Sequence, residues 1–198
     1  MSSDPFVGRA IPAEDPGILI PRKVFLTRGV GVAGRKLTSF EFALREAGIE
    51  RCNLVRVSSI FPPHCRRLGR DEGVRLIRSG AITFGVLAEI ATDEPGRRVA
   101  SSIGLALPTD PDRYGYLSEH EAYGQTAEES GDLAEGLAAS MLASSLGVEL
   151  AEDTPLEHLR RLEIEGMIYR TTNITAAAAG DSGGRWTTVV AAAVFVGY

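Results

Sequence analysis

The chain has 198 residues, of which 44% are hydrophobic, and its formal net charge at pH 7 is -5. A chain of this length can bury one good core, so we expect residues 1–198 to form a single domain. Phosphate binding relies on clustered Lys and Arg, so the acidic balance argues against a nucleic-acid partner. The longest apolar stretch, residues 189–196, is far shorter than a membrane span, which argues against a membrane protein. Two cysteines are too few for a disulfide framework and no signal segment opens the chain, so we expect a cytoplasmic location.

Strands and helices are expected to follow one another irregularly. Residues 1–20 are rich in Pro, Gly and acidic side chains and should form an N-terminal arm. Two helices are predicted, at residues 38–48 and from Thr126 towards Gly147, each opened by a capping box in which a Glu follows a Thr by three residues. Runs of β-branched and small residues between turn signals predict strands. These runs cover residues 23–26, 53–60, 81–91, 98–107, 115–121, 166–173 and 186–198, with a turn or a close approach at 176–180. Such an order indicates an α+β fold, a mixed sheet with helices on its faces, rather than a regular βαβ alternation.

Residues 29–34 read G-x-G-x-x-G after a predicted strand, which is the signature of a dinucleotide-binding turn. In such a turn the helix begins within the glycine run, whereas here the better N-cap is Thr38. No βαβαβ repeat follows to receive a nucleotide. We therefore favour a glycine-rich loop that lets the backbone approach a small substrate or a neighbouring subunit, with a nucleotide-binding module as the alternative.

The pair Ser58 and Ser59 lies between an apolar run and a double proline. If the Ser59 hydroxyl attacked the Ser58 carbonyl, the peptide would become an ester, and elimination followed by hydrolysis would leave a ketone. A chain can in this way make an electron sink from its own backbone. Asn53 lies six residues upstream, where a continuous strand would put it on the face of Ser59 as an oxyanion donor. The alternative is that the serine pair only ends a buried strand before a turn.

Glu119 and Glu121 should share one face of the predicted strand 115–121, with His120 on the other. A carboxylic acid kept neutral by burial can protonate a carbanion, and Glu119 is our candidate for this role. An exposed charged stripe is the alternative. A metal site is not expected, because His120 points away and no second ligand cluster exists. His64 and Cys65 are adjacent and cannot face each other as a nucleophile pair in an extended chain.

Three segments, residues 40–49, 53–63 and 115–121, together resemble the pyruvoyl-dependent arginine decarboxylases in order and spacing. The resemblance extends over roughly residues 20–150. It implies that Ser59 is the precursor of a covalent pyruvoyl cofactor and that self-cleavage gives a β chain, 1–58, and an α chain, 59–198. It implies the following site residues: Ser59, Glu119 and Asn53 as catalytic residues, and Glu41, Leu44, Ser58 and Ile60 at the substrate pocket.

The resemblance further implies a four-layer αββα sandwich, with mixed or antiparallel sheets and helices on the outer faces. Active sites would lie between subunits of a trimer or a dimer of trimers. The implied reaction converts arginine to agmatine and carbon dioxide, with Glu41 holding the guanidinium through paired hydrogen bonds. Glu41 could instead reach back to the helix cap, and the family commonly has an aspartate there. A decarboxylase of another amino acid and an unprocessed, non-catalytic oligomer are the alternatives.

Overall fold

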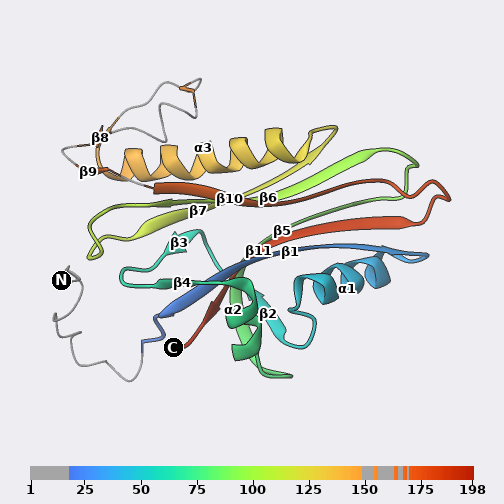
Figure 1. Cartoon of the computed structure of the whole chain (residues 1–198), viewed down its shortest axis with the longest axis horizontal. Coiled ribbons are helices and arrows are strands. Elements are labelled where there is room, and N and C mark those ends of the chain that lie inside the picture. The colour runs from blue at the N-terminus through green and yellow to red at the C-terminus, as the bar shows by residue number, and fades with distance from the viewer. Residues whose placement is uncertain (1–17, 149–153, 156–162, 165–166, 169) are drawn as a thin grey trace, which may run out of the picture.

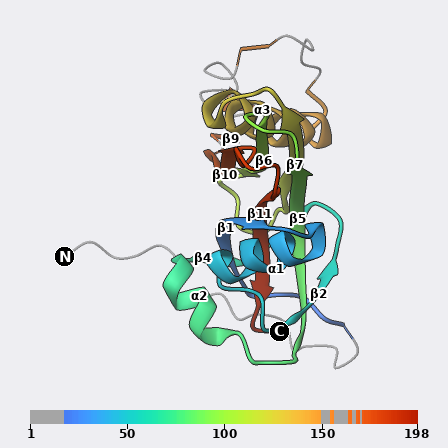
Figure 2. The same ribbon diagram turned by 90° about the vertical axis from the view of Figure 1, so that its right-hand side faces the viewer.

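Two β-sheets pack face to face and carry helices on their outer faces (Figure 1). The computed structural model describes residues 18–148, 154–155, 163–164, 167–168 and 170–198. The turned view shows α3 (Ala127–Ser145) above the pair of sheets, and α1 (Lys36–Ala47) and α2 (Arg70–Leu76) below it (Figure 2). The order of layers is thus helix, sheet, sheet, helix, which is the sandwich implied by the resemblance. The arm expected over residues 1–20 lies almost entirely outside the described residues.

The five-stranded sheet has the order β2-β5-β11-β1-β4 and the four-stranded sheet the order β10-β6-β7-β3. The first contains β2 (Asn53–Arg56), β5 (Ile82–Thr92), β11 (Trp186–Val196), β1 (Lys23–Ala33) and β4 (Arg66–Leu68). The second contains β10 (Arg170–Ala179), β6 (Arg98–Leu107), β7 (Gly115–Tyr123) and β3 (Ile60–Phe61), and a separate pair is formed by β8 (Glu163–Ile164) and β9 (Met167–Ile168). The β2–β5 and β1–β4 pairs are parallel and the others antiparallel, so the larger sheet is mixed, as expected.

Helices α1 (Lys36–Ala47) and α2 (Arg70–Leu76) lie on the five-stranded sheet, and α3 (Ala127–Ser145) lies on the four-stranded sheet (Figures 1 and 2). None of the helices in the described ranges is long and apolar enough to cross a membrane.

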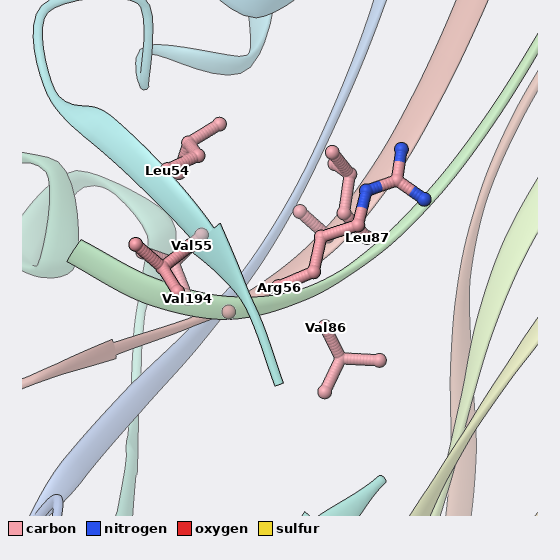
Figure 3. Close-up of a pocket in the computed structure, with 8 residues that line it drawn as sticks. Leu54, Val55, Arg56, Val86, Leu87 and Val194 are labelled. Atoms are coloured by element: carbon pink, nitrogen blue, oxygen red, sulfur yellow. The ribbon is translucent and has the colours of Figure 1, made fainter. Parts of the chain in front are cut away.

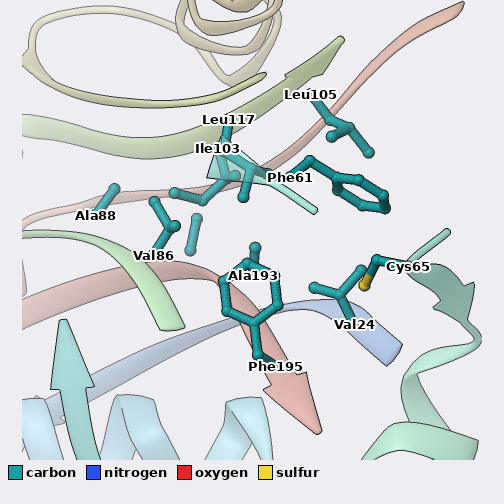
Figure 4. Packing of buried hydrophobic residues seen from close by; sticks show 11 residues of the cluster. Val24, Phe61, Cys65, Val86, Ala88, Ile103, Leu105, Leu117, Ala193 and Phe195 are labelled. Atoms are coloured by element: carbon teal, nitrogen blue, oxygen red, sulfur yellow. The ribbon is translucent and has the colours of Figure 1, made fainter. Parts of the chain in front are cut away.

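The main apolar core lies between the two sheets (Figure 4). Its largest members include Phe61, Ile103 and Leu117 from one sheet and Val24, Val86 and Phe195 from the other. A second cluster packs between α1 and the outer face of the five-stranded sheet. Strand β11 runs through the centre of that sheet and is covered on both sides, which explains why its sequence is apolar without alternation.

The helix predicted at residues 38–48 begins earlier than expected. α1 starts at Lys36 with Arg35 as its N-cap, and no side chain caps it, so the capping box of Thr38 and Glu41 is wrong. Its end was placed correctly: Gly48 adopts the left-handed conformation, with φ of 77°, in which glycine carries no steric penalty. The capping box of α3 is confirmed, with Thr126 accepting from the Glu129 backbone.

Three predicted strands are changed in the structure, the first being residues 23–26, which continue to Ala33 in β1. Residues 53–60 form β2 and β3 in different sheets, separated by an irregular segment. The small residues from 176 to 179 belong to β10, so the turn expected there comes later. Strand β4 and helix α2 were not predicted, because their charged sequences carry no clear period.

The glycine run at residues 29–34 is neither a nucleotide-binding turn nor the loop that we favoured. Gly29 and Gly31 lie inside β1, beneath α1. A Cβ atom on either glycine would overlap the helix backbone, at the carbonyl oxygens of Ala43 and Ser39 respectively. The two glycines therefore allow a helix to pack directly on a strand.

Replacing Gly31 with alanine should destabilise the fold by about 3 kcal/mol, because the helix backbone must move to admit the methyl group. Gly34→Ala is the matched control, since nothing lies within 4 Å of its Cβ position and its φ is not positive. Thermal and urea unfolding measure the effect. Equal stability of the two variants would contradict this account of the glycine run.

Candidate active site

Residues 57–59 carry the chain from one sheet to the other. β2 ends at Arg56 on an edge of the five-stranded sheet, and β3 begins at Ile60 on an edge of the four-stranded sheet. We call residues 57–59 the crossing segment. It contains the serine pair at which the sequence predicts cleavage.

Backbone hydrogen bonds fix both ends of the crossing segment. The Val57 N–H donates to the Gly85 carbonyl of β5 at 3.1 Å, and the Leu117 N–H of β7 donates to the Ser59 carbonyl at 2.8 Å. The peptide bond between Ser58 and Ser59 lies between these two anchors. This peptide bond is thus held at both ends and belongs to neither strand.

The side chain of Ser59 reaches the acid predicted on β7. Its Oγ donates a hydrogen bond to Glu119 Oε2 at 2.8 Å, although the two residues are 60 positions apart. Both residues are half-buried. The structure therefore joins the predicted nucleophile to the predicted proton donor.

The alternation expected on β7 is confirmed. Glu119 accepts from the crossing segment and Glu121 from the backbone of β5, so both face the other sheet. Ser118 and His120 face α3 and the turn before it: Ser118 donates to a helix carbonyl and His120 bonds Gln125. Glu119 is therefore no part of an exposed stripe.

The Ser58 carbonyl oxygen has a backbone donor. It accepts a hydrogen bond from the Ile60 N–H at 3.0 Å, which closes a three-residue turn centred on Ser59. Attack at this carbonyl would place negative charge on an oxygen that already has a donor. Sequence analysis missed this role, because a backbone N–H leaves no residue-type signal.

The described hydrogen bonds of Asn53 go to residues 80 and 81 and not to the Ser58 carbonyl. Its side-chain Nδ2 donates to the Gly80 carbonyl at 3.0 Å and its backbone N–H to the Ala81 carbonyl at 2.8 Å. The argument that Asn53 shares a face with Ser59 is wrong, because the strand between them breaks after Arg56. The described contacts of Asn53 fix the start of β2 instead.

Glu41 and Leu44 lie on α1, on the outer face of the five-stranded sheet. Glu41 Oε1 pairs with the guanidinium of Arg45, one helical turn on, at 2.5 Å. Leu44 is half-buried against the cluster under α1. No contact among the described residues joins either side chain to Ser59 within this chain.

His64 and Cys65 face different surroundings, as expected. His64 lies against Asp112, with 3.0 Å between Nε2 and Oδ1, while Cys65 belongs to the core between the sheets. Burial raises the pKa of the Cys65 thiol from 9.0 to about 12. Cys65 therefore stays protonated at neutral pH and serves as an apolar core residue.

A cavity of about 230 Å³ opens near β1 and β10, lined among others by Arg28, Glu46 and Thr175. Arg28 donates to the Thr175 carbonyl, and the Glu46 carboxylate accepts from the Val30 N–H. These contacts satisfy backbone groups of β10 and β1. None of the predicted site residues lines this cavity.

Comparison with known proteins matches residues 23–198 to the family described as pyruvoyl-dependent arginine decarboxylase. A relative from Nitrosopumilus maritimus, named pyruvoyl-dependent arginine decarboxylase, is 51% identical over 179 residues, covering 90% of this chain and 98% of its own. A relative from Chloroherpeton thalassium, named probable pyruvoyl-dependent arginine decarboxylase, is 49% identical over 178 residues, covering 89% and 98%. One from Methanosarcina acetivorans, named pyruvoyl-dependent arginine decarboxylase 2, is 51% identical with 90% and 98% covered.

The family description and the names of these relatives indicate a carboxy-lyase that uses a covalently bound pyruvoyl group. The chain belongs to the pyruvoyl-dependent arginine decarboxylase family.

The protonated state of Cys65 can be checked with a thiol reagent. In a Cys52→Ser variant, native protein at pH 8 should show almost no labelling, because a pKa near 12 keeps the thiolate fraction about a thousandfold below that of an ordinary thiol. Denaturation should expose one reactive thiol per chain. Rapid stoichiometric labelling of the native variant would contradict the burial of Cys65.

Proposed function

We propose that this protein cleaves its own backbone between Ser58 and Ser59 and then decarboxylates arginine to agmatine and carbon dioxide. The observation that carries the proposal is the 2.8 Å hydrogen bond from Ser59 Oγ to Glu119 Oε2. Family membership and the names of the relatives support the substrate and the cofactor. The two free cysteines, Cys52 and Cys65, support a reducing compartment, and we place the reaction in the cytoplasm.

Self-cleavage begins with the Ser59 hydroxyl. Its Oγ attacks the Ser58 carbonyl carbon while the Glu119 carboxylate takes the hydroxyl proton. The Ile60 N–H donates to the oxygen that gains negative charge. Collapse of the tetrahedral species breaks the bond from the Ser58 carbonyl carbon to the Ser59 nitrogen, which takes the proton back from Glu119, and leaves an ester between Ser58 and Ser59.

Elimination then completes the cut. Loss of the Ser59 Cα proton breaks the bond between Cβ and Oγ, and Oγ departs with the Ser58 carboxylate. The remaining dehydroalanine takes up one water and releases ammonia, which leaves the ketone at residue 59. Asn53 acts in this proposal by fixing the start of β2 ahead of the crossing segment.

The residues present fit the pyruvoyl group. Position 59 is half-buried, lies at the edge of both sheets and has a carboxyl group within hydrogen-bond distance of its side chain. The ketone supplies an electron sink for the bond between the substrate carbon and its carboxylate. Glu119 delivers the proton that the product carbon requires, and Ser58 and Ile60 line the site as its chain neighbours.

Glu41 and Leu44 would serve the site of a neighbouring subunit in a trimer or dimer of trimers. α1 lies on the outer face of the sheet, away from the crossing segment, so a single chain leaves these residues unused. Glu41 already binds one guanidinium, that of Arg45, and the same carboxylate geometry suits the guanidinium of arginine. Oligomer formation would thus complete the substrate pocket.

Ser59→Ala should abolish both cleavage and decarboxylation, because no hydroxyl remains to attack. Glu119→Gln should slow cleavage and turnover by about a hundredfold each, since one group transfers the proton in both reactions. Denaturing mass analysis separates fragments 1–58 and 59–198 from the intact chain, and release of carbon dioxide measures turnover. Wild-type protein of full-length mass would leave a non-catalytic oligomer as the better account, and an active Ser59→Ala protein would refute the mechanism.

Sites shared between subunits predict complementation. Co-expressed Ser59→Ala and Glu41→Ala subunits, each inactive alone, should recover about a quarter of wild-type activity, because random mixing pairs an intact Ser59 with an intact Glu41 at that fraction of interfaces. Ser59→Ala with Glu119→Gln is the control, because these two residues meet within one chain. Its recovery should be nil. If co-expressed Ser59→Ala and Glu41→Ala subunits recovered no activity, Glu41 would act within its own subunit or would have no role in the site.

A further inference from the structure

Glu89 of β5 contacts two strands that meet at the crossing segment. Its Oε2 accepts a hydrogen bond from Arg56 Nη2 at 2.7 Å. Its backbone N–H donates to Glu121 Oε1 at 3.3 Å. Arg56 is the last residue of β2 before the crossing segment, and Glu121 is on the same face of β7 as Glu119.

The strand arrangement explains how one residue makes both contacts. β2 pairs with β5 only as far as Gly85, so the edge of β5 beyond it has no ladder partner on that side within the described residues. The Arg56 side chain leaves the end of β2 and lies over β5 (Figure 3), where Glu89 accepts from it. The backbone N–H of Glu89 donates a hydrogen bond to the carboxylate of Glu121, which belongs to the opposite sheet.

The ladder between β3 and β7 is short. Only two residue pairs, Ile60 with Tyr116 and Phe61 with Gly115, hold β3 beside the strand that carries Glu119. The contacts of Glu89 add a second link to β7. This link runs from Arg56, upstream of the proposed cut, through Glu89 of the other sheet to Glu121. The position of Ser59 relative to Glu119 therefore depends on both sheets.

The ion pair contributes little to folding. The side chains of Arg56 and Glu89 are 55% and 38% exposed, and pairs exposed to this degree are screened by water and rarely measurable in stability. Its effect should instead appear in the geometry of attack, where a small misplacement of reacting groups costs rate.

We infer that Glu89 is a positioning residue for the self-cleavage between Ser58 and Ser59, whose carboxylate acts through Arg56 while its backbone N–H, which every variant at this position keeps, binds Glu121. This inference rests on the proposed function. Among the described residues no hydrogen bond joins Glu89 to Ser59. The inference therefore concerns the placement of the reacting groups and not the binding of substrate. After the cut, Arg56 and Glu89 belong to different chains, so the same pair then holds the new carboxyl end beside α-chain residues.

The test follows cleavage of freshly synthesised, uncut precursor by denaturing mass analysis. Glu89→Gln, which keeps the side-chain size, and Arg56→Gln should each slow cleavage about tenfold, because each removes one charge of the pair. The exchanged pair, Arg56→Glu with Glu89→Arg, should recover most of the wild-type rate. All four proteins should melt within about 2 °C of one another, since the pair is exposed.

Glu72→Gln is the matched control. It breaks the exposed pair of Arg66 and Glu72, whose side chains are 62% and 47% exposed, away from the crossing segment. This variant should cleave at the wild-type rate.

Three results would overturn the inference: wild-type cleavage rates in both single variants, no recovery in the exchanged pair, or slow cleavage accompanied by a large fall in melting temperature. A wild-type precursor that stays intact would refute the proposed function and this inference together. If the wild-type precursor cleaves and the variants cleave slowly, the proposed function is supported and the result concerns the role of Glu89 alone.

Discussion

The passage of the chain between two sheets at residues 57–59 is the constraint on which the site depends. Because β2 and β3 are edge strands of different sheets, the peptide between Ser58 and Ser59 cannot join a ladder. Its carbonyl, that of Ser58, accepts locally from the Ile60 N–H, and the carbonyl of the next peptide, that of Ser59, accepts from the Leu117 N–H of β7. In the proposed cleavage the Leu117 N–H would hold Ser59 in place, and the Ile60 N–H would support negative charge on the attacked Ser58 carbonyl.

The same architecture explains how the fold can survive a broken backbone. The segment before the cut contributes β1, which lies between β11 and β4 and pairs with β11 over eleven positions. α1 packs on this strand through Gly29 and Gly31, so the proposed β chain is held by a ladder and a core rather than by its peptide link to Ser59. Cleavage would then leave the two chains associated.

Much of the fold and the central pair of the site could be predicted from the sequence, because their signals are local. Strand β6 was placed at its observed bounds, and the capping box of Thr126 marks the start of α3. The break after Arg56 could not be predicted, since alternating apolar residues look the same whether a strand continues or changes sheet. Likewise the glycine pattern at residues 29–34 is compatible with a nucleotide-binding turn and with a strand beneath a helix. Only the packing of α1 on Gly29 and Gly31 distinguishes the two. Glu89 is the single carboxylate in the apolar strand β5, which marks it as unusual. Its role could not be predicted, because its partner Arg56 is distant in the sequence.

The hydrogen bond between Ser59 and Glu119 suits opposite proton transfers before and after the cut. Before it, Glu119 accepts from the hydroxyl that attacks. In the proposed elimination the bond between Cβ and Oγ breaks, so this oxygen ends in the new carboxyl group of Ser58. Two carboxyl groups would then stand where a hydroxyl and a carboxylate stood. One carboxyl group, that of Glu119, would thus act on both sides of the proposed cut, first taking the proton of the attacking hydroxyl and later delivering a proton to the product carbon.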